Sequence, residues 1–202
     1  MKNLLHIIAT PRTQESRTLK VSGVFIDRIK DKYPACKIDT LDLSVENIPV
    51  LTTKQLDGKY TLLGGGELAG EQKDAWKEIV HHIERFLSAD SYLITTPMWN
   101  FSIPYILKHY IDVIVQPKYL FRYTETGPEG LAKNKKMLII TSRGGDYSAG
   151  SPFRHYDFQE PHLKTIFGFV GITDIRFINA QPMDAMGAEV QKEKIEAAKA
   201  IA

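Results

Sequence analysis

The sequence predicts an α/β protein with a doubly wound, five-stranded parallel sheet and helices on both faces. Short apolar runs alternate with amphipathic segments along the chain, and turn-forming residues separate many of them. The apolar runs are also nearly continuous, which is typical of strands buried on both faces of a parallel sheet.

The N-terminal part of the chain supplies two strands and one helix. Leu4 to Ala9 is an apolar run that ends at the turn-forming Thr10-Pro11-Arg12 and is the first expected strand. A helix follows from Ser16, because apolar residues recur at roughly helical spacing until Tyr33-Pro34. Lys37 to Leu43 is the second expected strand.

Residues 44 to 69 predict a long, partly mobile excursion, because they combine Pro49, Gly58 and Gly64-Gly65-Gly66 with little periodicity. The glycine triplet has an alternative interpretation as a phosphate-binding loop. The triplet lacks the Gly-Lys-Ser/Thr ending of such a loop and follows no clear strand, so a flexible surface loop is favoured.

Helical spacing resumes at about Gln72 and continues to Leu87. Ser91 to Thr96 is the third expected strand, and a second amphipathic helix begins near Pro104 and ends before Pro117.

The C-terminal part supplies two more strands. These are Lys136 to Ser142, which Arg143-Gly144-Gly145 ends, and Asp174 to Asn179, with helices at Pro161 to Val170 and Gly187 to Ala202. Five strands in this alternation match the flavodoxin-like architecture. Its ligand lies beyond the carboxyl ends of the strands at a topological switch point, so the loops after strands one, three and four are the expected site.

Length and composition fit a single domain over residues 1–202 with small-molecule partners. The chain is 43% apolar and 25% charged, and its net charge of +2 gives no strong field for nucleic acid or membrane. No run reaches the ~18 apolar residues of a membrane span. The apolar stretch within residues 1–9 is too short for a signal peptide, so we expect a cytoplasmic location. The single Cys36 has no disulfide partner and no metal-ligand pattern around it, so we expect no metal.

The first loop of the expected site, Ala9 to Thr18, is rich in hydroxyl groups and cations. Ser16, Arg17 and Thr18 lie where a helix begins, and free N–H groups there bind a phosphate. Without G-x-G-x-x-G a dinucleotide is disfavoured, and a single phosphate ester such as that of FMN fits better. The alternative is that Ser16 only caps the helix.

The other two loops suit a flat heteroaromatic ring. Pro97 to Ser102 offers two aromatic rings, a thioether and an amide, although Trp99 and Phe101 have the alternative role of capping the core. Gly144 and Gly145 allow close approach of a planar ligand, and a tight turn without a ligand is the alternative.

The histidines give weaker evidence. His6 is expected to be a core residue, and His81-His82 are expected to lie on a solvated helix face. For His155 and His162, a role at the site and a polar helix start both remain open.

Four blocks of the sequence resemble the FMN-dependent NADH-azoreductases, flavodoxin-like enzymes also described as NADH:quinone oxidoreductases. The blocks, in family order, are "PMWNFSIP" from Pro97, "FRYTETGPEGL" from Phe121, "ITSRGG" from Ile140 and "FGFVGITDI" from Phe167. The resemblance implies a homodimer with one FMN per subunit, at a site that the other subunit partly closes.

The resemblance also assigns residues to the cofactor. Trp99 stands where the family usually has tyrosine, which puts acceptor preference in question more than FMN binding. The cofactor-binding residues that it implies are Thr10, Ser16, Arg17, Thr18, Met98, Trp99, Asn100, Phe101, Ser142, Arg143, Gly144 and Gly145.

The implied function is transfer of two electrons from NADH or NADPH to quinones and azo compounds, including reductive cleavage of aromatic azo bonds, by a ping-pong mechanism. The flavin carries the chemistry, so no catalytic side chain is assigned. The alternatives are a flavodoxin-type FMN electron carrier without small-molecule turnover and a flavin-free regulatory protein. The near-neutral charge disfavours the carrier.

Overall fold

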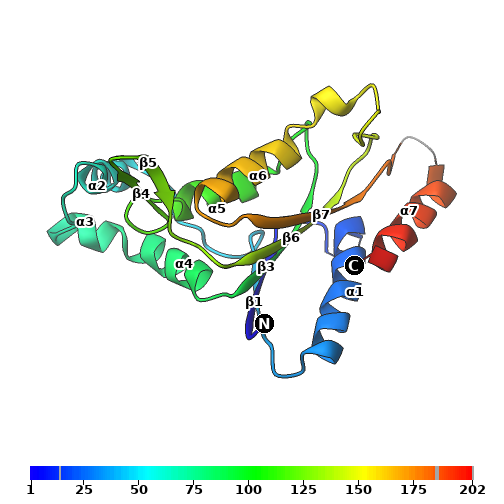
Figure 1. Ribbon diagram of the computed structural model, residues 1–202, viewed down its shortest axis with the longest axis horizontal. Coiled ribbons are helices and arrows are strands. Elements are labelled where there is room, and N and C mark those ends of the chain that lie inside the picture. Colours follow the sequence, from blue (N-terminus) through cyan, green and yellow to red (C-terminus); the bar gives the residue numbers. More distant parts are fainter. Residues whose placement is uncertain (14, 185–186, 202) are drawn as a thin grey trace.

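A five-stranded parallel sheet forms the centre of the computed structural model, which describes residues 1–13, 15–184 and 187–201. The strand order is β2-β1-β3-β6-β7 (Figure 1). This order confirms the predicted flavodoxin-like sheet. The strands are β1 Asn3–Ile8, β2 Lys37–Asp42, β3 Ser91–Pro97, β6 Lys136–Ser142 and β7 Asp174–Ala180.

Seven α-helices surround the sheet in the described part of the chain. Those that pack on its two faces come from different parts of the sequence: α4, α5 and α6 contribute to one core cluster, and α1 and α7 to the other (Figure 1). The helices are α1 Arg17–Lys32, α2 Thr53–Leu63, α3 Gly70–Ala75, α4 Lys77–Leu87, α5 Tyr105–Ile114, α6 Gln159–Phe169 and α7 Gly187–Ile201.

Both faces of the sheet are apolar because successive strand residues point to opposite faces. On β1, Leu5 and Ile7 belong to the cluster with α4, α5 and α6, whereas Leu4 belongs to the cluster with α1 and α7. On β3, Leu93 joins the second cluster and its neighbour Ile94 the first. Burial on both faces explains why the strands read as continuous apolar runs.

The parallel order brings the carboxyl ends of β1, β3 and β6 to one edge of the sheet. The chain leaves β1 for β2 on one side of the sheet and continues through β3 on the other side. The switch point therefore lies between β1 and β3, where the site was expected.

The prediction of a long, partly mobile excursion over residues 44 to 69 is wrong for the central part, because this part forms helix α2. Its start carries Thr52 and Gln55, and the Thr52 N–H donates to the Gln55 side chain at 3.1 Å. The glycine triplet that follows is also held, because Lys118 Nζ donates to the carbonyl oxygens of Gly65 at 2.8 Å and Gly66 at 2.6 Å.

Two further elements differ from expectation. The helix predicted from Gln72 is divided into α3 and α4, with Trp76 between them. The segment after α5 forms an antiparallel hairpin of β4 Phe121–Thr124 and β5 Gly127–Gly130, which the sequence analysis did not assign as strands. Gly130 must be glycine, because a Cβ there would lie 2.3 Å from Gly171 N.

None of the described helices is long and apolar enough to cross a membrane. The final residue of the predicted terminal helix, Ala202, lies outside the described part of the chain.

His6 is a buried core residue on β1, as predicted, with Nε2 2.8 Å from Thr95 Oγ1. The prediction of a solvated face holds for His81 but is wrong for His82, which is buried on α4. Burial lowers the pKa of His6 from 6.5 to about 4, although Asp42 opposes the change. Between pH 6.5 and about 4, His6 therefore stays neutral in the folded protein but is protonated in the unfolded chain.

This difference predicts acid sensitivity. Because the pKa of His6 is lower in the folded state, stability is complete above pH 6.5 and falls as the pH decreases from 6.5 towards 4. The loss approaches roughly 3 kcal/mol at the lower end. Denaturant unfolding of wild type and His6→Gln at pH 7 and pH 4 measures it. The wild type should lose more stability than the variant, and His81→Gln, at an exposed site, should behave like the wild type. Equal losses in wild type and His6→Gln would contradict this origin.

Candidate functional site

The loops after β1, β3 and β6 meet at the carboxyl edge of the sheet. The Ala9 N–H donates to Thr95 O at 2.8 Å, and the Met98 N–H donates to Ser142 O at 2.9 Å. A cavity of about 170 Å³ lies between the loops. Its lining residues are Thr10, Arg12, Ser16, Arg17, Thr18, Pro97, Met98, Trp99, Ser142, Arg143, Gly144 and Asp184.

The hydroxyl groups of the first loop line this cavity beside the start of α1. Ser16 is the N-cap, and its Oγ accepts a hydrogen bond from the Leu19 N–H at 3.3 Å. Thr18 Oγ1 lies 3.2 Å from Ser142 Oγ, which links the first loop to the third. Ser16 therefore both caps α1 and lines the cavity. Ser16 and Thr18 are both buried at the N-terminus of this helix.

Arg17, one of the two cations of the first loop, has a partner that the sequence did not indicate. Arg17 Nη1 lies 2.5 Å from Asp184 Oδ1, and the Asp184 N–H donates to Gly144 O at 3.0 Å. Asp184 comes from the connection after β7. This connection lies outside the loops after strands one, three and four, where the sequence places the site. The neighbouring Arg12 also lines the cavity.

The second loop forms a tight turn at the mouth of the cavity. Trp99 and Ser102 exchange two backbone hydrogen bonds, of 3.0 and 2.9 Å. Between them, Asn100 and Phe101 have φ values of 47° and 69°, as a type I′ turn requires. The rings of Trp99 and Phe101 are 38% and 46% exposed, so they do not cap the core. Asn100 and Phe101 lie at the tip of the turn and do not line the cavity.

The third loop contributes backbone more than side chains. Ser142 and Gly144 line the cavity, whereas Gly145 lies beside it against Tyr147. A Cβ on Gly144 would lie 2.8 Å from Asp184 Oδ2, and one on Gly145 would lie 3.1 Å from Tyr147 Oη. Neither glycine has a positive φ, so close packing rather than turn geometry accounts for them. Within the described ranges, the N–H groups of both glycines have no acceptor.

Arg143 lines the cavity, but its side chain is fully buried behind the third loop. Its Nη1 lies 2.9 Å from Asp157 Oδ2, and its Nε donates to Gln159 Oε1 at 3.1 Å. Burial lowers the pKa of Arg143, and the nearby carboxylates of Asp157 and Glu160 oppose the change. The guanidinium is therefore bound within the protein, and only the rest of Arg143 is available to line the cavity.

The chemistry of this donor set fits FMN. Hydroxyls, a cation and a helix N-terminus suit a phosphate ester, and the apolar side chains of the second loop suit a flat ring. The cavity is smaller than the ~300–1,000 Å³ of pockets that enclose a drug-sized ligand. It has room for the phosphate end, and the ring would rest on the open side near Trp99.

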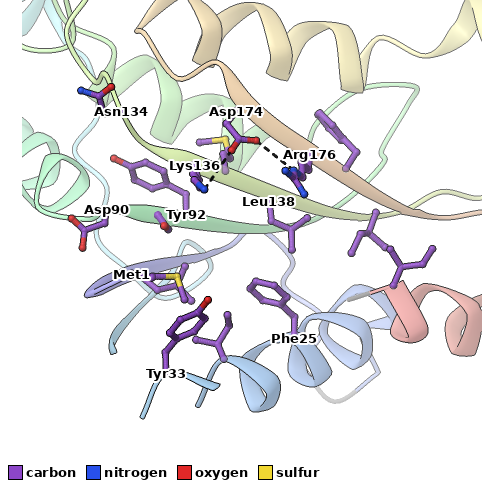
Figure 2. Close-up of a pocket in the computed structure, with 17 residues that line it drawn as sticks. Met1, Phe25, Tyr33, Asp90, Tyr92, Asn134, Lys136, Leu138, Asp174 and Arg176 are labelled. Atoms are coloured by element: carbon purple, nitrogen blue, oxygen red, sulfur yellow. Dashed lines mark ion pairs between the residues drawn. The ribbon is translucent and has the colours of Figure 1, made fainter. Parts of the chain in front are cut away.

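A larger cavity, of about 700 Å³, is a separate feature at the amino edge of the sheet (Figure 2). Apolar residues of the sheet and of α1 form much of it, and its cations Lys136 and Arg176 both lie within 4.0 Å of Asp174. It contains none of the expected site residues. Despite its larger volume, this cavity is not the candidate cofactor site, because the phosphate donors lie at the opposite edge of the sheet.

The two histidines near the third loop do not line the candidate cavity. His155 is exposed on the 3₁₀ turn η1 Arg154–Tyr156. His162 is half-buried on α6, and burial lowers its pKa. Their positions favour the polar helix start that the sequence analysis left as an alternative. No group of three metal-binding side chains occurs among the residues that the structure describes.

Comparisons with known proteins agree with this geometry. A family model described as flavodoxin-like fold matches residues 2–202. An "FMN-dependent NADH:quinone oxidoreductase" of Nitratidesulfovibrio vulgaris is 36% identical over 96% of this chain and 93% of that protein. A protein named "FMN-dependent NADH:quinone oxidoreductase 2" from Clostridium perfringens is 41% identical over 97% of this chain and 93% of that protein.

A solved structure extends the likeness to the whole chain. The crystal structure of an FMN-dependent NADH-azoreductase from Bacillus anthracis, in complex with FMN, is similar with a TM-score of 0.84. It is 31% identical, and the match covers 100% of both chains. The chain therefore belongs to the flavodoxin-like family that contains the FMN-dependent NADH:quinone oxidoreductases and azoreductases.

Proposed function

We propose that the protein is an FMN-dependent oxidoreductase that transfers two electrons from NADH or NADPH to quinones and azo compounds, with reductive cleavage of aromatic azo bonds. The observation that carries the proposal is the convergence of three loops on one cavity, with phosphate donors at one end and exposed aromatic rings at the other. The names of the relatives support FMN, NADH, quinones and azo compounds as its ligands.

The first loop would hold the phosphate of FMN. Ser16 and Thr18 supply hydroxyls, Arg17 supplies a cation, and the first turn of α1 supplies N–H groups that lack helical partners. Thr10 lies beside them and completes the polar wall. Because Arg17 is already paired with Asp184, a bound phosphate would share that cation with a carboxylate.

The second and third loops would hold the ring. Met98 and Trp99 line the cavity, and Asn100 and Phe101 continue the same surface at the turn tip. The N–H groups of Gly144 and Gly145 would serve the polar edge of the ring and stabilise negative charge there. When bound, FMN supplies the chemistry by accepting a hydride and releasing two electrons to an acceptor.

The proposal includes a homodimer in which the partner subunit closes the open side of the site. The support is a group of exposed aromatic rings around that side, because large exposed apolar surfaces mark interaction sites. The exposed rings are Trp99, Phe101, Tyr105, Phe153, Tyr156 and Phe158. A single species of monomer mass in sedimentation of the FMN-loaded protein would contradict the proposed homodimer. The single-domain organisation and the cytoplasmic location stay predictions.

Steady-state kinetics of the purified, FMN-loaded protein test the function. Varying NADH at several fixed quinone concentrations should give parallel double-reciprocal lines, because the donor leaves before the acceptor binds. Intersecting lines would contradict the ping-pong order. A protein that binds FMN but oxidises no NADH would be an electron carrier, and one that binds no FMN would have kept only the fold.

Trp99→Tyr should retain FMN and change acceptor preference, because the side chain lines the mouth of the cavity rather than the phosphate end. The change reduces the aromatic area beside the ring and adds a hydroxyl. We expect the ratio of kcat/KM for an azo dye to that for a quinone to change about three- to tenfold. Trp99→Phe separates the two effects, since it reduces the area without a hydroxyl. Unchanged ratios in both variants would show that Trp99 does not select acceptors.

A further inference from the structure

A buried charged cluster lies directly behind the third loop. Arg143 and Asp157 form an ion pair of 2.9 Å in which neither side chain is exposed to solvent. Such a pair costs desolvation that two apolar side chains would avoid, so stability alone does not explain it.

The cluster connects the second loop, the third loop and the start of α6. Gln159 Oε1 accepts from Arg143 Nε at 3.1 Å, while Gln159 Nε2 donates to Pro97 O at 2.8 Å. Asp157 Oδ1 accepts from the N–H groups of Gln159 and Glu160, at 3.0 Å each, and so fixes the start of α6. One carboxylate and one amide thereby hold three segments in register.

The same segment carries aromatic rings to the open side of the site. The rings of Phe101 and Tyr156 are stacked, with centroids 5.2 Å apart and planes 27° apart, and the Phe158 N–H donates to Phe101 O at 3.0 Å. We call Phe101, Tyr156 and Phe158 the aromatic wall. All three side chains are exposed, so core packing does not fix them. Their position depends on the backbone around Asp157, which lies between two of them.

We propose that Arg143 and Asp157, with Gln159 as the bridge to Pro97, are positioning residues that hold the aromatic wall beside the flavin and so favour extended planar acceptors over single-ring ones. This inference rests on the proposed function. Beside a bound flavin, an acceptor with two fused rings would offer the wall more aromatic surface than a single ring does. Aromatic contacts of this kind are worth about two- to tenfold in binding.

The test compares two acceptors on each FMN-loaded variant, 1,4-benzoquinone and a 1,4-naphthoquinone. In a ping-pong reaction, kcat/KM for the acceptor depends only on the oxidative half, so the NADH step cancels from the ratio. Asp157→Asn should lower the naphthoquinone-to-benzoquinone ratio about fivefold. Arg154→Gln is the matched control, because Arg154 contacts the same carboxylate oxygen at 2.7 Å but is 44% exposed. Its ratio should stay within twofold of the wild type.

Two further variants separate positioning from general stability. Phe158→Ala removes part of the wall and should lower the same ratio, and Asp157→Asn should have a smaller effect in its presence than in the wild type, because both act through one surface. If Asp157→Asn does not fold, Gln159→Met breaks the bridge to Pro97 with the ion pair intact and should lower the ratio as well.

The outcomes also separate this inference from the proposed function. A wild-type ratio in folded, FMN-loaded Asp157→Asn or Gln159→Met, or full additivity with Phe158→Ala, overturns the positioning role. A wild-type protein that does not oxidise NADH overturns the proposed function itself.

Discussion

Replacing Arg17 with alanine should weaken FMN binding about 10- to 100-fold. Arg17 begins α1, lines the candidate cavity and is the cation of the predicted phosphate site. A hydrogen bond to a charged group is worth about 1.5–3 kcal/mol, which corresponds to this change in the dissociation constant. The effect is measured by titrating the apoprotein with FMN and recording the quenching of flavin fluorescence.

Lys20→Ala is the control for this prediction. It removes a cation from the same helix at an exposed position that does not line the cavity. Its FMN affinity should stay within twofold of the wild type, and raising the salt concentration should weaken the wild type more than Arg17→Ala. Equal affinities in wild type and Arg17→Ala would place the phosphate elsewhere.

Replacing Trp76 with alanine should reduce the free energy of unfolding by about 3–5 kcal/mol. Trp76 is fully buried between α3 and α4, and its Nε1 donates to Gln55 O on α2 at 3.0 Å. Its ring also fills the space beside Gly58, where a Cβ would lie 2.3 Å from Trp76 Nε1. The loss would leave a cavity and remove the side-chain hydrogen bond from Trp76 to α2. Denaturant unfolding followed by circular dichroism measures the change.

Tyr60→Ala is the matched control on α2, because this aromatic side chain is 70% exposed. It should alter stability by about 0.5 kcal/mol or less. A Trp76→Ala variant as stable as Tyr60→Ala would show that α2 is not anchored through Trp76.

The centre of the sheet was predictable from the sequence because β1, β3 and β6 are buried on both faces. Leu4, Leu5 and Ile7 lie in two different core clusters, so both faces of β1 require apolar residues. This requirement makes parallel strands stand out as unbroken apolar runs between polar loops. The strand order then followed from the match to the flavodoxin-like architecture.

Helix α2 was not predictable from its apolar pattern. Only Gly58 and Leu62 are buried among its residues, so it presents little apolar periodicity. Gly58 suggested a break, although the structure requires it for contact with Trp76. The pattern Thr52-x-x-Gln55 was the one local indication of a helix start.

The position of the candidate site was predictable, but the partners of some of its side chains were not. The loops that contain Ser16, Met98 and Gly144 meet as expected, because the carboxyl ends of parallel strands share one edge. Arg143 follows β6 in the sequence as a ligand residue would, yet its partners Asp157 and Gln159 lie 14 and 16 residues further along the chain. Such distant pairings have no local pattern. The same holds for Arg17 and Asp184.

An anaerobic stopped-flow experiment tests the central claim most directly. The FMN-loaded protein is first mixed with NADH and then with a quinone or an azo dye, while the visible absorption of the flavin is recorded. Rapid loss of the flavin band with NADH, followed by its return with either acceptor, is the predicted result. A band that NADH leaves unchanged, or a reduced flavin that neither acceptor reoxidises, would contradict the account.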